Sequence, residues 1–255
     1  MAVERVVAVV QARMGSTRLP GKVLTDIAGR TMLDRVLTRL ERSDRVDEVV
    51  VATSTLAPDD AIVAAGAELG FRVVRGDALD VLSRYAVAAR ASEADVVVRV
   101  TSDCPFIDPD VVSSVVGALV DAPEPVDYAA NTLEPRSYPR GLDCEVMTVA
   151  ALLEADRLDD DPGTREHVTP FIRDSGRYRL VAVAHPVDLS AIRWTVDTDE
   201  DLELARQMAA HFGGRDDVPW LELLRAWQER PAWQALNAQV EQKPVVRTRP
   251  LPPPG

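Results

Sequence analysis

Cysteine and positive charge are both scarce in this chain of 255 residues. The two cysteines, Cys104 and Cys144, are too few for a disulfide scaffold and lie at no metal-ligand spacing, so we expect reduced thiols and no zinc site. The 41 acidic residues outnumber the 29 basic ones, which gives a net charge of -12. A chain without a broad basic surface is poorly suited to grip nucleic acid or an anionic membrane. We therefore expect neither as a partner.

Long apolar runs are absent as well. No stretch reaches the roughly 18 to 20 apolar residues that a membrane-spanning helix needs. The apolar run at 6–10 is typical of a strand, and no signal-peptide cleavage pattern follows it. We expect a soluble cytoplasmic protein.

The two best-known glycine-rich phosphate motifs are missing from the segment after this first run. The ATPase loop needs Gly, four residues and then Gly-Lys-Ser/Thr, but five residues separate Gly15 from Gly21, and Val23 replaces the hydroxyl residue. The G-x-G-x-x-G dinucleotide fingerprint does not occur either, which disfavours an ordinary NAD site.

Positive charge is nevertheless concentrated near the N-terminus. Residues 1–45 contain nine basic and five acidic residues, and Arg13, Arg18 and Lys22 follow the first apolar run closely. Gly15 and Ser16 offer backbone N–H groups in the same loop. Ligands of open parallel sheets bind beyond the carboxyl ends of the strands, where this loop must lie, so we predict a polyphosphate site. The alternative is a solvated turn whose arginines pair with nearby acids.

Short β-branched runs alternate with amphipathic stretches over the first half of the chain. This alternation predicts an α/β fold with a mainly parallel sheet covered on both faces. Pro58, Asp59 and Asp60 suit the first turn of a helix, because carboxylates favour the positive end of the helix dipole. The expected strands are 6–10, 48–53, 71–74, 95–101 and 178–184, and the expected helices are 31–42, 58–69, 78–90 and 108–119.

The pattern changes after residue 120, where proline and turn formers accumulate. We expect an insertion or dimerisation subdomain over about 121–185, including a strand at 142–149, that covers the working edge of the sheet. Helices at 199–212 and 217–229 would close a single domain of residues 1–230. The remainder, 231–255, is expected to be a largely flexible extension.

Two aspartates follow strand-like segments and are candidates to hold Mg²⁺. Asp103 lies just past Val96–Val100, and Asp197 directly follows Ile192–Val196. Mg²⁺ commonly takes one or two protein carboxylates and completes its shell with phosphate oxygens and water. Alternatively, Asp103 caps a turn before Pro105.

The segment GTREHVTPFI supplies another candidate pair. His167 is suited to act as a general base or hydrogen-bond donor, and Arg165 to grip an anion. Equally, this segment fits a helix start with Thr164 as N-cap and His167 three positions later.

Taken in order, QARMGSTRLPGKVL, RGDALDVLSRY, VRVTSDCPFIDP, GLDCEV, REHVTPFI and WTVDTDEDLELAR resemble the cytidylyltransferases that make CMP-activated acidic sugars. The resemblance covers about residues 5–210 and is strongest to the spore-coat-polysaccharide branch. The 3-deoxy-manno-octulosonate and acylneuraminate cytidylyltransferases are more distantly similar. The resemblance implies a three-layer α/β/α Rossmann-like nucleotidyltransferase fold, similar to GT-A glycosyltransferases, with a mixed, mainly parallel sheet. It also implies a homodimer.

This resemblance implies roles for individual residues. Arg13, Arg18 and Lys22 would contact the triphosphate of CTP, and Asp103 and Asp197 would hold Mg²⁺ as the cofactor. The other predicted nucleotide-binding residues are Ala12, Gly15, Ser16, Asp80, Ser83, Arg84 and Ser102. For the acceptor we predict residues in the insertion and in loops that could face the metal, namely Arg140, Asp143, Glu145, Arg165 and His167.

The expected reaction is a Mg²⁺-dependent transfer of CMP from CTP to a small anionic acceptor, with release of pyrophosphate. One alternative is a GT-A glycosyltransferase that uses a nucleotide sugar, although such enzymes usually rely on an Asp-x-Asp metal motif rather than on a loop with three cations. The other is a nucleotide-binding protein without catalytic activity. No motif specifies the acceptor.

Overall fold

The computed structural model describes residues 5–242, and a seven-stranded sheet forms its centre. The strand order is β5-β4-β1-β6-β8-β7-β9. Within the described residues only β8 runs against its neighbours. The predicted mixed, mainly parallel sheet is therefore confirmed. The strands are β1 (Val6–Gln11), β4 (Glu48–Ser54), β5 (Arg72–Gly76), β6 (Val96–Thr101), β7 (Tyr128–Ala130), β8 (Glu145–Thr148) and β9 (Leu180–Ala182).

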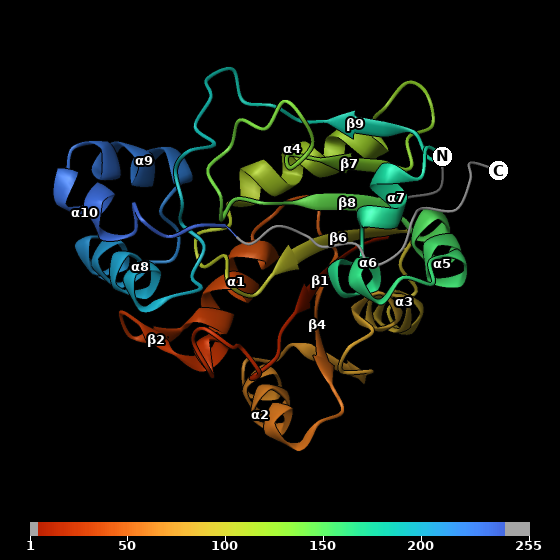
Figure 1. The fold of residues 1–255 in the computed structure, drawn as a ribbon, viewed down its shortest axis with the longest axis horizontal. Coiled ribbons are helices and arrows are strands. Elements are labelled where there is room, and N and C mark those ends of the chain that lie inside the picture. The colour runs from red at the N-terminus through yellow and green to blue at the C-terminus, as the bar shows by residue number, and fades with distance from the viewer. Residues whose placement is uncertain (1–4, 243–255) are drawn as a thin grey trace.

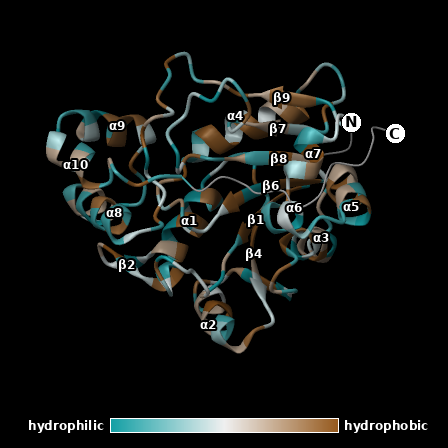
Figure 2. Cartoon of the chain, viewed as in Figure 1, coloured by the Kyte–Doolittle hydropathy of each residue, from teal (hydrophilic) through white to brown (hydrophobic). Residues whose placement is uncertain are grey.

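Valine-rich strands at the middle of this sheet are buried on both faces. In β1, Val7 and Val9 pack into one apolar cluster, whereas Val6 and Val10 pack into another on the opposite face. The helix layer on the face of Val6 and Val10 consists of α1 (Met32–Glu41), α2 (Asp60–Glu68) and α4 (Pro109–Val120). The layer on the face of Val7 and Val9 consists of α3 (Val81–Ala91), α5 (Val149–Leu158) and α7 (Pro170–Asp174). Figure 1 shows α1 and α3 on opposite sides of β1, and Figure 2 shows hydrophobic residues concentrated between the layers.

The segment 121–185 is part of the main sheet and does not form a separate subdomain. It supplies β7, β8 and β9, and β8 pairs directly with β6. Helices α5, α6 (Pro162–His167) and α7 belong to the same segment. The predicted insertion thus extends the sheet beside β6. Its proposed role in dimerisation stays a prediction.

A third apolar cluster joins the C-terminal helices to the N-terminal half. It contains α8 (Asp199–His211), α9 (Trp220–Gln228) and α10 (Pro231–Leu236), together with Ile27 of β2 (Asp26–Ile27), which pairs with β3 (Arg30–Thr31). Trp233 of α10 is only 7% exposed. The prediction of a flexible extension is therefore wrong for 231–236, while 243–255 lies outside the described residues.

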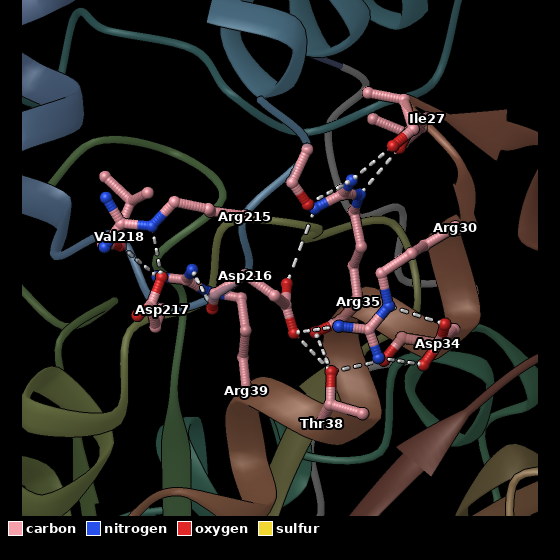
Figure 3. A network of polar contacts seen from close by, with 12 residues as sticks. Ile27, Arg30, Asp34, Arg35, Thr38, Arg39, Arg215, Asp216, Asp217 and Val218 are labelled. Atoms are coloured by element: carbon pink, nitrogen blue, oxygen red, sulfur yellow. Dashed lines mark hydrogen bonds and ion pairs between the residues drawn. The ribbon is translucent and has the colours of Figure 1, made fainter. Parts of the chain in front are cut away.

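Buried arginines of α1 bind the loop between α8 and α9 (Figure 3). Arg39 donates to the carbonyls of Ile107, Asp216 and Val218, and Arg35 donates to the carbonyl of Gly214. Backbone carbonyls that are buried need such donors, because an unpaired one costs free energy. The network fixes the C-terminal helices against the central layers.

The segment 192–196 is extended but forms no strand of the sheet. Its pairing is a single parallel bridge between Arg140 and Arg193. The strand-like segment Ile192–Val196 is therefore extended but does not join the sheet. No helix within residues 5–242 combines the length and the apolar character needed to cross a membrane.

Candidate functional site

A cavity of about 610 Å³ opens beyond the carboxyl ends of β1 and β6. Its walls come from the loop after β1 that carries Arg13, Arg18 and Lys22, the turn after β6, the segment 192–197 and the 121–185 segment. Thirteen predicted site residues line it: Ala12, Arg13, Gly15, Ser16, Arg18, Lys22, Arg84, Ser102, Asp103, Asp143, Glu145, His167 and Asp197.

Lys22 joins both predicted metal ligands. Lys22 is the first residue of the short 3-10 helix η1 (Lys22–Leu24). Gly21, with a φ of 72°, occupies the N-cap position before it. The Nζ of Lys22 lies 3.0 Å from Asp103 Oδ2 and 2.7 Å from Asp197 Oδ1, and donates to the carbonyl of Val196 at 2.8 Å. Burial alone would lower the pKa of Lys22, but the ion pairs with the two carboxylates outweigh it and raise the pKa above its usual value. The ammonium is therefore charged.

Asp197 is held by three cations. Besides Lys22, it pairs with Arg18 at 3.0 Å and with Arg193 at 2.8 Å. Burial would raise the pKa of Asp197, but Lys22, Arg193 and Arg18 together lower it. The carboxylate of Asp197 is thus ionised, and these three cations fix its orientation.

Asp201 supports this arrangement from the first turn of α8. Its carboxylate accepts from the amide of Asp197 at 3.0 Å and from Arg193, and it forms a capping box with Thr198. Asp201 is not among the predicted site residues. The spacing of Thr198 and Asp201, with an acid three residues after a threonine, was the available signal.

The pair Asp103 and Asp197 fits a hard divalent cation. No group of three or more His, Cys, Asp or Glu side chains suited to a metal occurs among residues 5–242, so a bound ion would rest on these two carboxylates. That matches Mg²⁺, which fills its remaining positions with phosphate oxygens and water. The ammonium of Lys22 already lies between them as a cation of single charge.

Arg13 and Arg18 both make ion pairs, as the alternative reading of this loop expected. Arg13 pairs with Glu166 at 3.1 Å and Arg18 with Asp197. Both partners line the same cavity, however, so the arginines are held at the site and not away from it. The amide of Ser16 donates to the carbonyl of Met14 at 2.9 Å, so this N–H is used inside the loop.

Arg84 is buried in the cavity wall and clamps the loop that precedes α3. Its Nη1 donates to the carbonyls of Asp77 at 2.9 Å and Ala78 at 3.3 Å. Asp80 caps α3 by accepting from the amide of Ser83, and neither of these two lines the cavity. Burial lowers the pKa of Arg84. Only Arg84 of the three predicted residues in this segment therefore reaches the site.

Glu145 is buried in the cavity wall and forms part of a compact network. It pairs with Arg99 of β6 and accepts from the hydroxyls of Tyr128 and Thr169. Burial would raise the pKa of Glu145, but these partners, Arg99 foremost, lower it. His167 also lines the cavity. Its burial, and to a lesser extent the charge of Arg99, lowers its pKa. We conclude that the imidazole is neutral near pH 7.

His167 lies at the end of α6 and not at its start. The N-cap of this helix is Asp161, whose side chain accepts from the amide of Gly163. The predicted helix start at Thr164 is therefore wrong, because Pro162 already fits the first helical position.

Two predicted acceptor residues do not line the cavity. Arg165 pairs with Asp80 at 2.6 Å and with Asp156 at 2.8 Å, which joins α6 to the start of α3 and to α5. The amide of Arg140 donates to the carbonyl of Ile192, and its carbonyl accepts from the amide of Trp194, so its backbone pairs with the segment 192–194. Their positions give no support to acceptor binding.

Sequence reasoning missed several residues that line the cavity. Arg99 was detectable, because a charge within the apolar strand VVVRVT needs a reason to be there. The hydroxyls of Thr132 and Thr195 are buried and have no hydrogen-bond partner within the described residues. No local pattern marks these threonines. Further lining residues are Gln11, Thr17, Thr101, Glu166, Thr169, Pro170, Arg173 and Gln242.

Comparisons with known proteins place this geometry in context. A family model described as cytidylyltransferase matches residues 7–228. The spore coat polysaccharide biosynthesis protein SpsF of Bacillus subtilis is 34% identical over 88% of this chain and 94% of its own length. A solved cytidylyltransferase from Leptospira borgpetersenii superposes with a TM-score of 0.87 at 30% identity, covering 94% of this chain and 100% of that one. A CMP:2-keto-3-deoxy-manno-octonic acid synthetase complexed with CTP has a TM-score of 0.62 at 24% identity, covering 82% and 99%, and so shares the fold.

Proposed function

Since the chain belongs to the cytidylyltransferase family and is a nucleotidyltransferase, we propose that it transfers CMP from CTP to a small anionic acceptor and releases pyrophosphate. The name of the B. subtilis relative supports an acceptor that enters a polysaccharide, and the CTP complexed with the compared CMP:2-keto-3-deoxy-manno-octonic acid synthetase supports the nucleotide. We propose an acidic sugar, a sugar phosphate or a phosphonate as acceptor.

The observation that carries this proposal is the cluster of Arg18 and Lys22 on Asp103 and Asp197. It brings a cationic loop and two acids, distant in sequence, to the carboxyl end of the sheet. A triphosphate with its metal ion needs both kinds of group within one site.

In the proposed reaction an oxygen of the acceptor attacks the α-phosphorus of CTP in line. The new bond joins that oxygen to phosphorus, while the bond from phosphorus to the pyrophosphate oxygen breaks. Arg13, Arg18 and Lys22 bind the phosphates and neutralise the charge that develops on the leaving group. No residue needs to form a covalent intermediate.

Asp103 and Asp197 would hold Mg²⁺, which would supply further neutralisation of phosphate charge. Lys22 would then share its carboxylate partners with the ion and direct its ammonium toward phosphate.

We propose that the acceptor binds at the part of the cavity wall that Asp143, Glu145 and His167 form. Arg99, which also lines the cavity, joins these predicted residues. His167 is neutral, and so its ring can accept a proton or a hydrogen bond from an acceptor hydroxyl. Arg140 and Arg165 are left out of this proposal. A cytoplasmic homodimer remains our prediction.

The deciding experiment measures pyrophosphate release with each of the four nucleoside triphosphates against a panel of acidic sugars, sugar phosphates and phosphonates. We expect release with CTP and an anionic acceptor only. Turnover that requires a nucleotide sugar would identify a glycosyltransferase instead. Binding of CTP without turnover of any acceptor would identify a non-catalytic nucleotide-binding protein.

A further inference from the structure

We propose that Asp59 is a positioning residue that fixes the phosphate-binding loop; the inference rests on the proposed function for its catalytic consequence. Asp59 ends the short 3-10 helix η2 (Ala57–Asp59) and occupies the N-cap position of α2. Its side chain makes no capping hydrogen bond, although the sequence had suggested a role in this first helical turn. The residue is only 3% exposed. A buried carboxylate that does not serve its own helix must be held by something else.

Both carboxylate oxygens of Asp59 are used between β4 and the cationic loop. Oδ1 accepts from the amide of Met14 at 2.8 Å. Oδ2 accepts from the amide of Ser54 at 3.3 Å and from the hydroxyl of the same serine. The serine hydroxyl in turn accepts from the amide of Leu56 at 3.2 Å. Asp59 thus connects the end of β4 to the loop after β1.

Met14 passes this connection on to the rest of the loop. Its carbonyl accepts from the amides of Ser16 at 2.9 Å and Gly21 at 3.0 Å. Gly21 adopts a left-handed conformation and directly precedes Lys22. Met14 is therefore bound at its amide by Asp59, while its carbonyl binds the amide of Gly21, the residue before Lys22. A shift of Met14 would move Arg13 and Lys22 together.

The chemistry of the contact requires a carboxylate. Met14 and Ser54 present two backbone donors, one to each oxygen of Asp59, and charge-assisted hydrogen bonds of this kind are stronger than neutral ones. An asparagine of the same shape has one oxygen only, so its NH₂ group would face one of the two N–H groups, donor against donor. Asparagine at 59 would therefore either release the amide of Met14 or hold it by a weaker, uncharged hydrogen bond.

Opposite this contact, Arg75 of β5 supports the 54–60 segment. Arg75 donates to the carbonyls of Ser54 at 2.9 Å and Leu56 at 3.0 Å and pairs with Asp60 at 2.6 Å. Asp60 is exposed and lies outside the cavity wall. It therefore offers a matched control: an adjacent carboxylate of equal charge that does not contact the loop.

The test compares Asp59→Asn with Asp60→Asn. Losing a charge-assisted hydrogen bond that orders a loop corresponds to about 10- to 100-fold in affinity. We expect calorimetry without acceptor to show CTP binding weakened by about that factor in Asp59→Asn. The KM for the acceptor should stay near that of the wild type, and Asp60→Asn should bind CTP normally. Unchanged CTP affinity in Asp59→Asn would overturn the inference.

Hydrogen exchange of the ligand-free protein separates this inference from the proposed function. In Asp59→Asn the amides of Met14 and Gly21 should exchange at least about 10-fold faster, while the amides of β1 keep their protection. Equal acceleration throughout β1 would indicate a general structural role and contradict the inference. If the wild type itself does not bind CTP, the proposed function fails, yet the exchange result still decides the role of Asp59.

A second variant covers the case in which Asp59→Asn does not fold. Ser54→Ala removes the hydroxyl that contacts Oδ2 but leaves the backbone donors in place. We expect a smaller effect on Met14 exchange, about two- to five-fold, because Ser54 acts on Met14 only through Asp59. No change at Met14 in Ser54→Ala together with an unfolded Asp59→Asn would count against the inference.

Discussion

Lys22 is the residue on which the proposed chemistry depends most directly. Its side chain is 12% exposed and its ammonium contacts Asp103, Asp197 and the carbonyl of Val196. A charge held this firmly, where we propose that the phosphates bind, needs no reorganisation during the reaction, which is what makes electrostatic stabilisation effective.

The variant Lys22→Met should lose turnover by about 10²- to 10³-fold, because a group that neutralises developing charge is removed. We expect it to fold, since Asp197 retains Arg18 and Arg193. Pyrophosphate release and circular dichroism measure the two outcomes. Arg45→Met, which removes an equal charge from an exposed ion pair outside the cavity wall, should behave as the wild type. Near-normal release in Lys22→Met would contradict the mechanism.

His167 gives the stability of the protein a predictable pH dependence. Its pKa lies below the usual value of 6.5 in the folded protein, so the unfolded chain takes up a proton first as the pH falls. Stability contributed by the neutral ring is present above 6.5 and is lost as the pH falls below it. In His167→Gln we expect a smaller loss of unfolding free energy between pH 7.0 and 5.5, measured with urea. A steeper loss than in the wild type would reverse the assigned sign.

At the scale of elements, the site depends on two neighbouring segments that are not sheet strands. Residues 140–142 lie against residues 192–195, and a Cβ on Gly141 would come within 2.8 Å of the carbonyl carbon of Trp194. Gly141 has a φ of 106°, in the region that favours glycine. This close approach places Asp197 at the cavity.

Gly141→Ala should therefore displace the segment that carries Asp197. Gly70→Ala is the matched control, because Gly70 has a φ of 84° but nothing within 4 Å of an added Cβ. Both variants carry left-handed strain of about 1 to 2 kcal/mol, so their difference isolates the collision. We expect Gly141→Ala to be the less stable in urea and to lose most pyrophosphate release, whereas Gly70→Ala stays active. Equal behaviour of the two would show that the contact with Trp194 is unimportant.

The regular elements could be predicted from the sequence because apolar residues mark them, as continuous runs in the central strands and at helical spacing in the helices. The runs around β1, β4 and β6 and the helices that cover them follow the expected ranges. In the segment 192–196, the apolar residues Ile192, Trp194 and Val196 alternate with polar residues, a pattern typical of a strand. They are buried in the third apolar cluster and not in the sheet. Alternation indicates an extended backbone with one buried side, and a partner strand is not required for that.

Residue contacts across the fold explain why the site was only partly predictable. Cations and acids in the loops that follow strands, such as Lys22 after β1 and Asp103 after β6, are placed by the general rule for parallel sheets. Arg165 and Asp80 also come from polar loops, but tertiary contacts pair them with each other. No sequence pattern separates a charge that faces ligand from one that finds a partner at the back of a helix.

For the whole molecule, the C-terminal helices are a structural part of the site. Asn237 donates to the carbonyl of Arg193 at 3.0 Å and to Asp201 at 2.8 Å, and Gln242 accepts from the side chain of Arg193 at 2.7 Å. The low apolar content of 231–255 suggested flexibility, but Trp233 and the partly buried Leu236 pack α10 into the third apolar cluster beside α8.

Trp233→Ala should lower the free energy of unfolding by about 3 kcal/mol, the usual range for a large buried aromatic side chain. Leu221→Ala, at a position 55% exposed on α9, should change it by less than about 0.5 kcal/mol. Urea unfolding of both variants provides the comparison. A Trp233→Ala protein as stable as the wild type would mean that α10 contributes nothing to the fold.

The span of chain that closes the cavity has a consequence for synthesis. Arg13 and Gln242 both line it, and Asp197 is oriented through Arg193 by residues as late as Gln242. On the ribosome the early strands can pair while the chain grows, but the cavity wall stays incomplete until residue 242 has emerged. A fragment that ends before residue 197 carries the cationic loop without Asp197, one of the two carboxylates that hold Lys22, and so we expect it to be inactive.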